Sequence, residues 1–188
     1  MSAEPMLMYD ETYEIINGEE VMLAAARPTH SSIVGNLLGI IHPFLKGKRC
    51  KVYDDTFVKL DRNNTFVPDL LVVCDRNKIK AGYIEGAPDF VAEILSQSTQ
   101  KRDVGIKKDT YERCGVKEYW LINPWDKSVT VYRLTDGRFE LYNIYRDYTE
   151  EELAEMDERE LAATELTLKL SLYDDLEIPV RDIFYDIS

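Results

Sequence analysis

Two hydrophobic runs in the middle of the chain each carry an acidic residue where the pattern calls for an apolar one. Asp69 precedes the run LLVVC, and Glu93 lies inside the run FVAEIL. Runs this rich in valine, isoleucine and leucine are typical of strands that are buried on both faces. A carboxylate in such a strand is costly unless it is paired, protonated or bound to a cation. The two acids therefore constrain both the fold and the chemistry.

The position of Glu93 within its run is the stronger constraint. Side chains alternate along a strand, so Glu93 shares one face with Val91 and Leu95. Burial would raise the pKa of Glu93, and a neighbouring Asp69 would raise it further unless a divalent cation lay between them. Two carboxylates directed at one point supply the oxygen ligands that Mg²⁺ takes. For Asp69 alone, a simple role in capping the turn after Pro68 stays open.

A helix is expected over residues 99–114, because serine and threonine residues that favour helix starts precede it. Lys107 falls near the centre of an apolar stripe that includes Val104 and Tyr111. Asp103, Lys107 and Tyr111 also stand four residues apart, so they form one row along the helix. Two interpretations stay open. The lysine extends to solvent and pairs with Asp103, or its ammonium group lies beside a scissile phosphate.

Other chemistries find little support in the sequence. The two histidines, His30 and His42, have no ligand partners at metal-binding spacing. His30 precedes the first predicted helix and is interpreted as a capping or packing residue, with a supporting role at the site as the alternative. Ser96 and Ser98 lack the GxSxG setting of serine hydrolases, and no glycine-rich phosphate loop is present.

The composition fits one globular domain over residues 1–188, with 45% hydrophobic and 31% charged residues. No run approaches the ~18 apolar residues of a membrane span, and the start of the chain lacks a secretory signal. Cys50, Cys74 and Cys114 form no CxxC pair. They favour reduced thiols and a cytoplasmic protein without a membrane partner over a disulfide framework or a zinc site.

The net charge of −12 argues against tight binding to nucleic acid, but the charge is unevenly distributed. Residues 121–188 hold 7 basic and 17 acidic side chains, a net charge of −10. Residues 46–117 hold 15 basic and 11 acidic side chains, a net charge of +4. The central segment could therefore make weak contacts with phosphates.

The remaining pattern predicts an α+β fold in which helices flank a mixed central sheet. A β-hairpin about Asn17-Gly18 and a second one about Asp136-Gly137 follow from their turn residues. Pro43 is expected to kink or shorten the first helix. The other expected elements are a lead-in over 1–10, strands at 13–16 and 20–24, a helix over 31–46, strands within 51–60, 66–74, 90–95 and 116–123, a loop with one helical turn at 75–87, a solvated helix or flexible acidic excursion at 149–165, and a closing strand and helix.

Taken together, VPDLLVVCD, PDFVAEILSQST, the row Asp103–Lys107–Tyr111 and GVKEYWLINP resemble the Uma-two family of restriction-endonuclease-like proteins. That family is a branch of the PD-(D/E)xK nuclease superfamily. The hairpin YEIINGEEV and the closing segment LEIPVRDIF are similar to its ends. The resemblance covers residues 13–183, with 149–165 as an acidic insertion, and it implies a restriction-endonuclease-like fold.

The resemblance implies a site as well. Asp69 and Glu93 match its two acids as ligands of Mg²⁺ or Mn²⁺, with the backbone of Ile94 as a third ligand. The superfamily often has a lysine two residues after the second acid, where this chain has Leu95, and Lys107 takes its place from the following helix. Asp103, Tyr111 and His30 are candidates for supporting roles. The frequent extra acid of the first helix has no match in this chain.

These observations favour a magnesium-dependent endonuclease that cleaves DNA through a metal-activated water and binds it weakly or without sequence preference. A non-catalytic nuclease-fold module for binding or assembly is the alternative, and a purely structural network of buried charges is a third. A homodimer is expected, on the hypothesis that apolar hairpin strands leave an edge or a face uncovered. Target sequence and biological role do not follow from the sequence.

Overall fold

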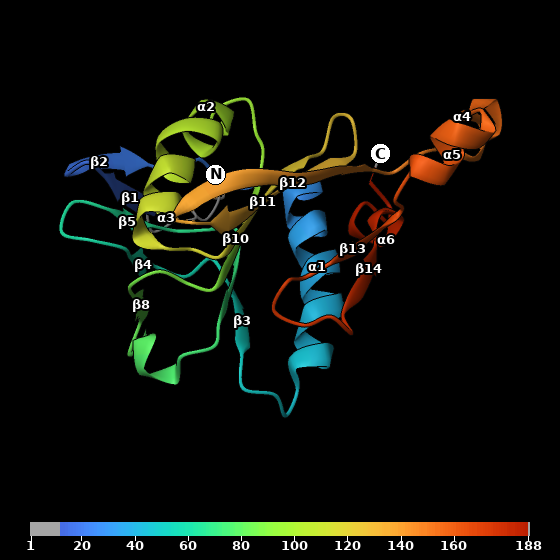
Figure 1. The fold of residues 1–188 in the computed structure, drawn as a ribbon. Helices are drawn as coiled ribbons and strands as arrows, with labels where there is room; N and C mark the ends of the chain where they lie inside the picture. The colour runs from blue at the N-terminus through green and yellow to red at the C-terminus, as the bar shows by residue number, and fades with distance from the viewer. Residues whose placement is uncertain (1–11, 188) are drawn as a thin grey trace, which may run out of the picture.

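A computed structural model describes residues 12–187, which form two six-stranded sheets with helices packed around them (Figure 1). The central sheet has the strand order β12-β11-β10-β9-β6-β3. β9 and β10 run parallel, and the other neighbours run antiparallel. This mixed sheet confirms the predicted α+β class. Its strands are β3 (Lys51–Asp54), β6 (Leu70–Val73), β9 (Phe90–Ile94), β10 (Glu118–Asn123), β11 (Ser128–Thr135) and β12 (Arg138–Arg146).

The second sheet has the order β2-β1-β5-β4-β8-β7 and begins with the predicted N-terminal hairpin. Asn17 and Gly18 both have positive φ, at 53° and 84°, which a two-residue hairpin turn requires. The lead-in expected over residues 1–10 lies outside the described residues. The strands of this sheet are β1 (Tyr13–Ile16), β2 (Glu19–Met22), β4 (Val58–Lys59), β5 (Thr65–Phe66), β7 (Ile79–Lys80) and β8 (Tyr83–Glu85).

The expectation of a loop over residues 75–87 is wrong in part. The helical turn exists as the 3-10 helix η1 (Arg76–Lys78), but a short hairpin of β7 and β8 follows it. Gly82 in its turn has φ +93°, a conformation that favours glycine. The two strands contain only two and three residues, so they present no alternating pattern long enough to be recognised in the sequence.

One face of the central sheet is covered by α1 (Pro28–Leu45). The helix starts three residues before the predicted position, at Pro28. Proline is favoured at this position because the first N–H groups of a helix have no partner within it. It also continues through Pro43 to Leu45, so the prediction that Pro43 shortens the helix is wrong. Its buried side chains repeat at helical spacing and pack on the sheet. They are Ile33, Leu37, Ile41 and Leu45.

The opposite face is covered by the second sheet and by a helical segment that follows β9. A single helix was predicted there, and the structure divides it into α2 (Gln100–Arg102), η2 (Asp103–Lys107) and α3 (Lys108–Cys114). Gly115, with φ 89°, ends the segment as expected. Both faces of β6 and β9 are therefore buried, which agrees with the apolar runs in the sequence.

The acidic segment over residues 149–165 forms two short helices, α4 (Glu150–Glu155) and α5 (Glu158–Ala163). Thr149 and Asp157 each start a helix with a capping box. Neither helix has a buried residue, and Figure 1 shows both beyond the end of β12, away from the sheets. The chain then closes with β13 (Thr167–Lys169), β14 (Glu177–Pro179) and α6 (Val180–Ile183) on the α1 side of the sheet.

The prediction of three reduced cysteines is wrong. Cys50 and Cys74 form a disulfide, and Cys114 is the free cysteine within residues 12–187. The register of β3 and β6 pairs Lys51 with Val73, so the next residues outward are the two cysteines. Their spacing of 24 residues gives no sign of this contact in the sequence. The thiols therefore no longer support a cytoplasmic location. No helix in residues 12–187 has the length and apolarity to span a bilayer.

Candidate active site

Asp69 and Glu93 lie side by side at the ends of two neighbouring strands. The antiparallel register pairs Leu70 of β6 with Ala92 of β9, so the next residues outward are Asp69 and Glu93. The Asp69 N–H donates to Glu93 Oε2 at 3.4 Å, and the Ile94 N–H donates to Asp69 Oδ2 at 2.6 Å. Residues 24 positions apart in the sequence thus form one acidic pair.

The ammonium group of Lys107 lies among three carboxylates. Its Nζ is 2.6 Å from Glu93 Oε1, 2.9 Å from Glu14 Oε1 and 3.8 Å from Asp103 Oδ1. Lys107 is only 4% exposed, so the interpretation as a lysine that extends to solvent is wrong. Burial of a charge is tolerated where opposite charges and hydrogen bonds compensate it, as they do here.

The helical segment places Lys107 by means of a π-helical turn over Asp103–Lys107. Gly105 in this turn has φ −112° and ψ −106°, which lie outside the helical region. Because the turn is wider than an α-helical one, it changes the angle between the side chains before Gly105 and those after it. Val104 is therefore 50% exposed instead of part of the buried stripe, while Asp103 and Lys107 both face inward.

Aromatic side chains enclose the acids and the lysine. The Tyr111 hydroxyl donates to Glu93 Oε1 at 2.7 Å, and the Tyr119 hydroxyl donates to the backbone carbonyl of Asp103 at 3.0 Å. The Phe66 ring packs edge-on against Tyr111 with 5.4 Å between ring centroids. All three rings are fully buried, so the electrostatic interactions beside them are stronger than at the surface.

Glu14 is a residue of the site that the sequence analysis missed. It is 1% exposed, and its Oε1 accepts hydrogen bonds from the Val67 N–H at 2.9 Å and from Lys107 at 2.9 Å. The signal that could have revealed it was the alternation along β1, which places Glu14 on the same face as the buried Ile16. It contributes an extra acid from the N-terminal hairpin, in a chain whose first helix has none.

His30 contacts the acidic pair directly. Its Nε2 lies 2.9 Å from Asp69 Oδ1, so the interpretation as a mere capping or packing residue is wrong. Arg27, and not His30, is the N-cap residue of α1. Burial lowers the pKa of His30, but the hydrogen bond to Asp69 and the charge of Asp69 outweigh this effect and leave the pKa raised.

The buried charges shift one another's pKa values. Burial raises the pKa of Glu93 well above its ordinary value, and the charges of Asp69, Asp103 and Glu14 add to this effect against the opposing influence of Lys107. Burial likewise raises the pKa of Asp103 to about 6. Burial lowers the pKa of Lys107, but the three carboxylates around it leave it raised, so the lysine stays charged at neutral pH.

The donor set fits a hard divalent cation in its chemistry. Asp69 and Glu93 supply carboxylate oxygens at adjacent strand ends, and Glu93 Oε2 has only a long hydrogen bond, of 3.4 Å, from the Asp69 N–H. Across residues 12–187 no three histidine, cysteine or acidic side chains are grouped as a metal cage. Ile94 contacts the pair through its N–H, and its backbone as a ligand stays a prediction.

Comparison with known proteins identifies the family of the chain. A family model described as "Uma2: Putative restriction endonuclease" matches residues 5–178, so the chain belongs to the Uma2 family and the resemblance seen in the sequence is confirmed. Restriction-endonuclease-like families generally use divalent metals. No curated protein matches the chain.

A solved structure is similar to the chain over most of its length. It is a crystal structure described as a "putative nuclease belonging to DUF820" from Anabaena variabilis, 21% identical in sequence, with a TM-score of 0.71. The match covers 94% of this chain and 91% of the other. The likeness confirms the predicted restriction-endonuclease-like fold.

Proposed function

We propose that the protein is a metal-dependent endonuclease that hydrolyses phosphodiester bonds in DNA, with Mg²⁺ or Mn²⁺ as the cation. The observation that carries this proposal is the Lys107 ammonium group held 2.6 Å from Glu93, beside the pair that Glu93 forms with Asp69. Phosphodiester hydrolysis requires ligands for a cation and a positive group near the phosphate. The family and the fold support the same class of activity.

Each residue has a distinct part in this proposal. Asp69 and Glu93 would hold the cation together with the backbone of Ile94. When bound, the cation would polarise the phosphate and lower the pKa of the attacking water. Lys107 would stabilise the negative charge that develops on the phosphate. The residues that would hold these groups in place are Glu14, His30, Asp103 and Tyr111.

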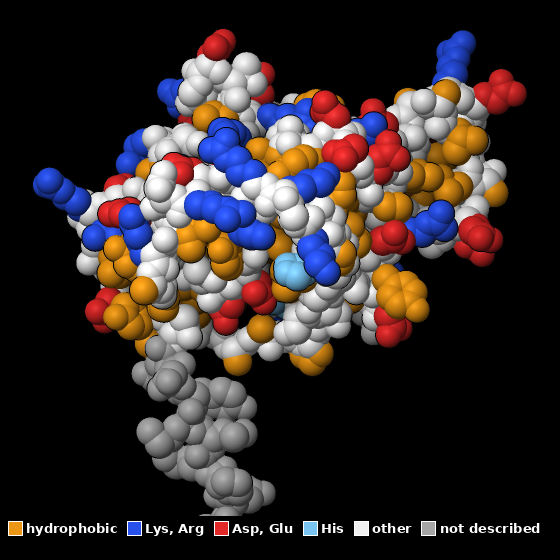
Figure 2. Space-filling view, turned by 90° about the horizontal axis from the view of Figure 1, so that it is seen from below, with side chains coloured by type: hydrophobic (Ala, Val, Ile, Leu, Met, Phe, Trp, Pro, Cys, Tyr) orange, Lys and Arg blue, Asp and Glu red, His pale blue; other side chains and the backbone are white. Residues whose placement is uncertain are grey.

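The surface supports weak contacts with DNA. Figure 2 shows lysine and arginine side chains near the middle of one face, with hydrophobic and acidic side chains around and between them. A tight DNA-binding protein presents a more uniformly basic surface, because neutralising phosphates supplies most of its affinity. We therefore expect binding that is weak, without sequence preference and strongly reduced by salt.

Nicking of supercoiled plasmid with Mg²⁺ or Mn²⁺ tests the proposal. Lys107→Ala should lower the rate roughly a hundred- to a thousandfold, because the developing charge loses its nearest cation. Lys108→Ala is the matched control and should cost far less, since Lys108 lies over the Tyr132 ring, 4.5 Å from its centroid. Lys107→Met, which keeps the buried stem, guards against loss of folding, and Asp69→Ala gives the background rate. Wild-type rates in both Lys107 variants would exclude this role.

Thermal unfolding tests the metal site without any nucleic acid. Mg²⁺ should raise the melting temperature of the wild type, because it binds the native state selectively. Glu93→Gln should remove most of this response. An equal shift in both proteins would place the cation elsewhere.

One observation favours the alternative of a non-catalytic module. Glu93 Oε1 is already engaged by both Lys107 and Tyr111, as it would be in a structural network of buried charges. The absence of metal-dependent cleavage by every variant on every nucleic acid tried would favour a role in binding or assembly.

We also infer that two copies of the chain associate through β12. This strand forms an edge of the central sheet and belongs to the hairpin about Asp136-Gly137. Leu141 and Ile144 on it are 55% and 57% exposed, so these two apolar side chains are not covered in the monomer. A sedimentation measurement that gives a monomer at all workable concentrations would contradict this inference.

A further inference from the structure

A cavity of about 270 Å³ opens between the end of β3, the connection from β3 to β4 and the β7–β8 hairpin. A second hollow of about 430 Å³ adjoins it, and the two share Phe57, Gly82 and Tyr83 in their linings. Their volumes are close to the lower end of the ~300–1,000 Å³ that small-molecule sites occupy. None of the proposed roles above uses this part of the molecule.

The hairpin at Gly82 builds the aromatic side of the cavity. Gly82 has positive φ and turns the chain, so Tyr83 begins β8 directly after the turn. The Ile84 N–H donates to the Phe57 carbonyl at 2.8 Å, which holds Tyr83 next to Phe57. Phe57 is 37% exposed and Tyr83 is 36% exposed, although neither ring is needed to fill the core.

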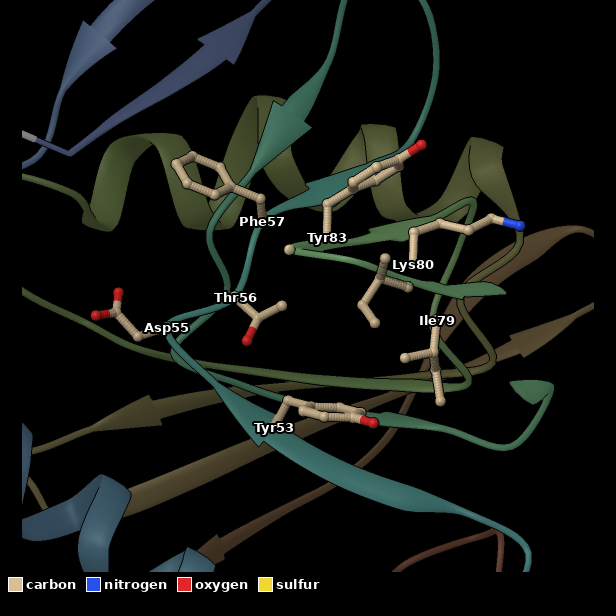
Figure 3. Close-up of a pocket in the computed structure, with 9 residues that line it drawn as sticks. Tyr53, Asp55, Thr56, Phe57, Ile79, Lys80 and Tyr83 are labelled. Carbon is tan, nitrogen blue, oxygen red and sulfur yellow. The ribbon is translucent and has the colours of Figure 1, made fainter. Parts of the chain in front are cut away.

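The lining combines flat aromatic surfaces with charges. Figure 3 shows Phe57 and Tyr83 along one side and Tyr53 on the opposite side, with Asp55 and Lys80 at the two ends. Exposed aromatic rings bind unpaired nucleobases by stacking. The lysine can contact a phosphate, while the Asp55 carboxylate can accept a hydrogen bond from an exocyclic amine. Lys80 pairs with Glu85 at 3.4 Å, and such an exposed pair is easily broken.

The cavity borders the segment that carries Asp69. On one side, Tyr53 and Asp54 of β3 pair with Leu71 and Leu70 of β6, and Asp69 immediately precedes that pair. On the other side, Val58 pairs with Phe66 of β5, three residues before Asp69, and Phe57 immediately precedes Val58. Residues on both sides of the cavity are thus paired with residues one to three positions from Asp69, so a DNA strand with a phosphate at the acidic pair would run close to the aromatic rings.

We propose that this cavity binds an unpaired nucleobase of a DNA strand whose backbone crosses the acidic pair. The inference rests on the proposed nuclease function and narrows its substrate to DNA with unpaired bases. In an intact duplex the faces of the bases are stacked on one another, so they cannot reach the rings. A single strand, a flap or a flipped base presents the free face that stacking requires.

Fluorescence anisotropy with a labelled single-stranded oligonucleotide tests this inference. The buffer contains EDTA and little salt, so that binding is measured without cleavage. The double variant Phe57→Ala/Tyr83→Ala should raise the Kd for the single strand roughly tenfold or more. Trp125→Ala removes another exposed aromatic side chain, 52% exposed in the turn after β10, and should leave the Kd unchanged. Circular dichroism confirms that each variant is folded.

Two further oligonucleotides separate stacking from charge. A strand of abasic sites keeps the phosphates but lacks the bases, so the wild type should bind it as weakly as the double variant does. A duplex of the same sequence should bind equally to the wild type and the double variant. Three results would overturn the inference. The double variant could lose as much affinity for the duplex as for the single strand, or the wild type could bind abasic and normal strands equally well. The third is a larger loss of affinity in the double variant for single-stranded RNA than for single-stranded DNA.

Plasmid nicking distinguishes a failure of this inference from a failure of the nuclease proposal. Metal-dependent nicking by the wild type, together with unchanged single-strand binding in the double variant, would overturn the cavity alone. Loss of single-strand binding in the double variant, together with no cleavage by the wild type, would support the cavity and reject the nuclease.

Discussion

At β6 and β9 both faces of the central sheet are buried, yet the two faces pack against different kinds of side chain. On the α1 face, aliphatic side chains such as Leu37 and Ile41 pack against Trp120 and Phe90. On the α3 face, Glu14, Glu93, Asp103 and Lys107 interrupt an otherwise apolar cluster. One sheet thus packs against an apolar core on one side and against a cluster of buried charges on the other.

The contrast is sharpest between two glutamates on neighbouring strands. Glu118 is fully buried beside the α1 core. Its Oε1 accepts from the Trp120 indole N–H at 2.6 Å, and its Oε2 accepts from the Ser171 N–H at 2.9 Å and lies 3.4 Å from Arg133 Nε. Its partners are an indole N–H, a backbone N–H and a guanidinium group, which are all hydrogen-bond donors. Glu93 instead faces other acids and a lysine, so its surroundings change with protonation and with bound cations.

The largest effect is expected on the α1 face. Leu37→Ala should lower the free energy of unfolding by about 2–5 kcal/mol, because it removes buried methyl groups and leaves a cavity. Urea denaturation measures this loss. The rise in melting temperature with Mg²⁺ should stay as in the wild type, since α1 packs on the other side of the sheet. A loss below about 1 kcal/mol would mean that this core is loosely packed.

The same substitution at the two glutamates should have unequal effects. Glu118→Gln places an amide where both oxygens accept hydrogen bonds, so one donor loses its partner and unfolding should become easier by about 1–3 kcal/mol. Glu93→Gln should cost much less, because it also relieves repulsion from Asp69 and Asp103. Urea denaturation of both variants makes the comparison. Equal losses would show that the two buried acids contribute to stability in the same way.

Glu14→Gln should lower the free energy of unfolding by about 1–2 kcal/mol. The amide oxygen can still accept from Val67 and Lys107, but the hydrogen bond from Lys107 loses its charged acceptor. The pH profile of nicking should stay as in the wild type, because Glu93 raises the pKa of Lys107 more strongly than Glu14 does. Urea denaturation and nicking at several pH values measure the two effects. A decline of the variant alone at alkaline pH would show that Lys107 depends on Glu14 for its charge.

The smallest effect is expected for His30→Asn. The pKa of His30 is raised in the folded state by Asp69, so the pair stabilises the fold fully below the ordinary value of 6.5. This contribution is lost as pH rises through the raised folded pKa. Just below pH 6.5 the variant should be less stable than the wild type by up to about 1 kcal/mol, after allowance for solvent screening. Urea denaturation at mildly acidic and alkaline pH should show the difference shrink, and a constant or growing difference would contradict this account.

The sequence predicted the parts of the site whose signals are local. The alternation around Glu93 and the four-residue row from Asp103 to Tyr111 place side chains correctly because each depends on one strand or one helix. The exposure of Val104 was missed because the π-helical turn at Gly105 changes the helical repeat. The local sequence pattern does not predict that turn.

Contacts between distant segments were harder to predict. The disulfide of Cys50 and Cys74 depends on β3 lying next to β6, and the β7–β8 hairpin depends on pairing with β4. Such pairings are set by the tertiary fold, and strands of two or three residues carry too few side chains to indicate them.

The ion pair between Glu14 and Lys107 joins residues 93 positions apart. Closing so long a loop is slow compared with forming the hairpin or the helical segment, because its entropic cost must be met before the contact contributes stability. We therefore expect the hairpin of β1 and β2 to form before Glu14 contacts Lys107. During synthesis, a nascent chain that has exposed Glu14 but not yet Lys107 holds an incomplete site. We therefore expect the contact between Glu14 and Lys107 to form later in folding than the hairpin and the helical segment that carry these residues.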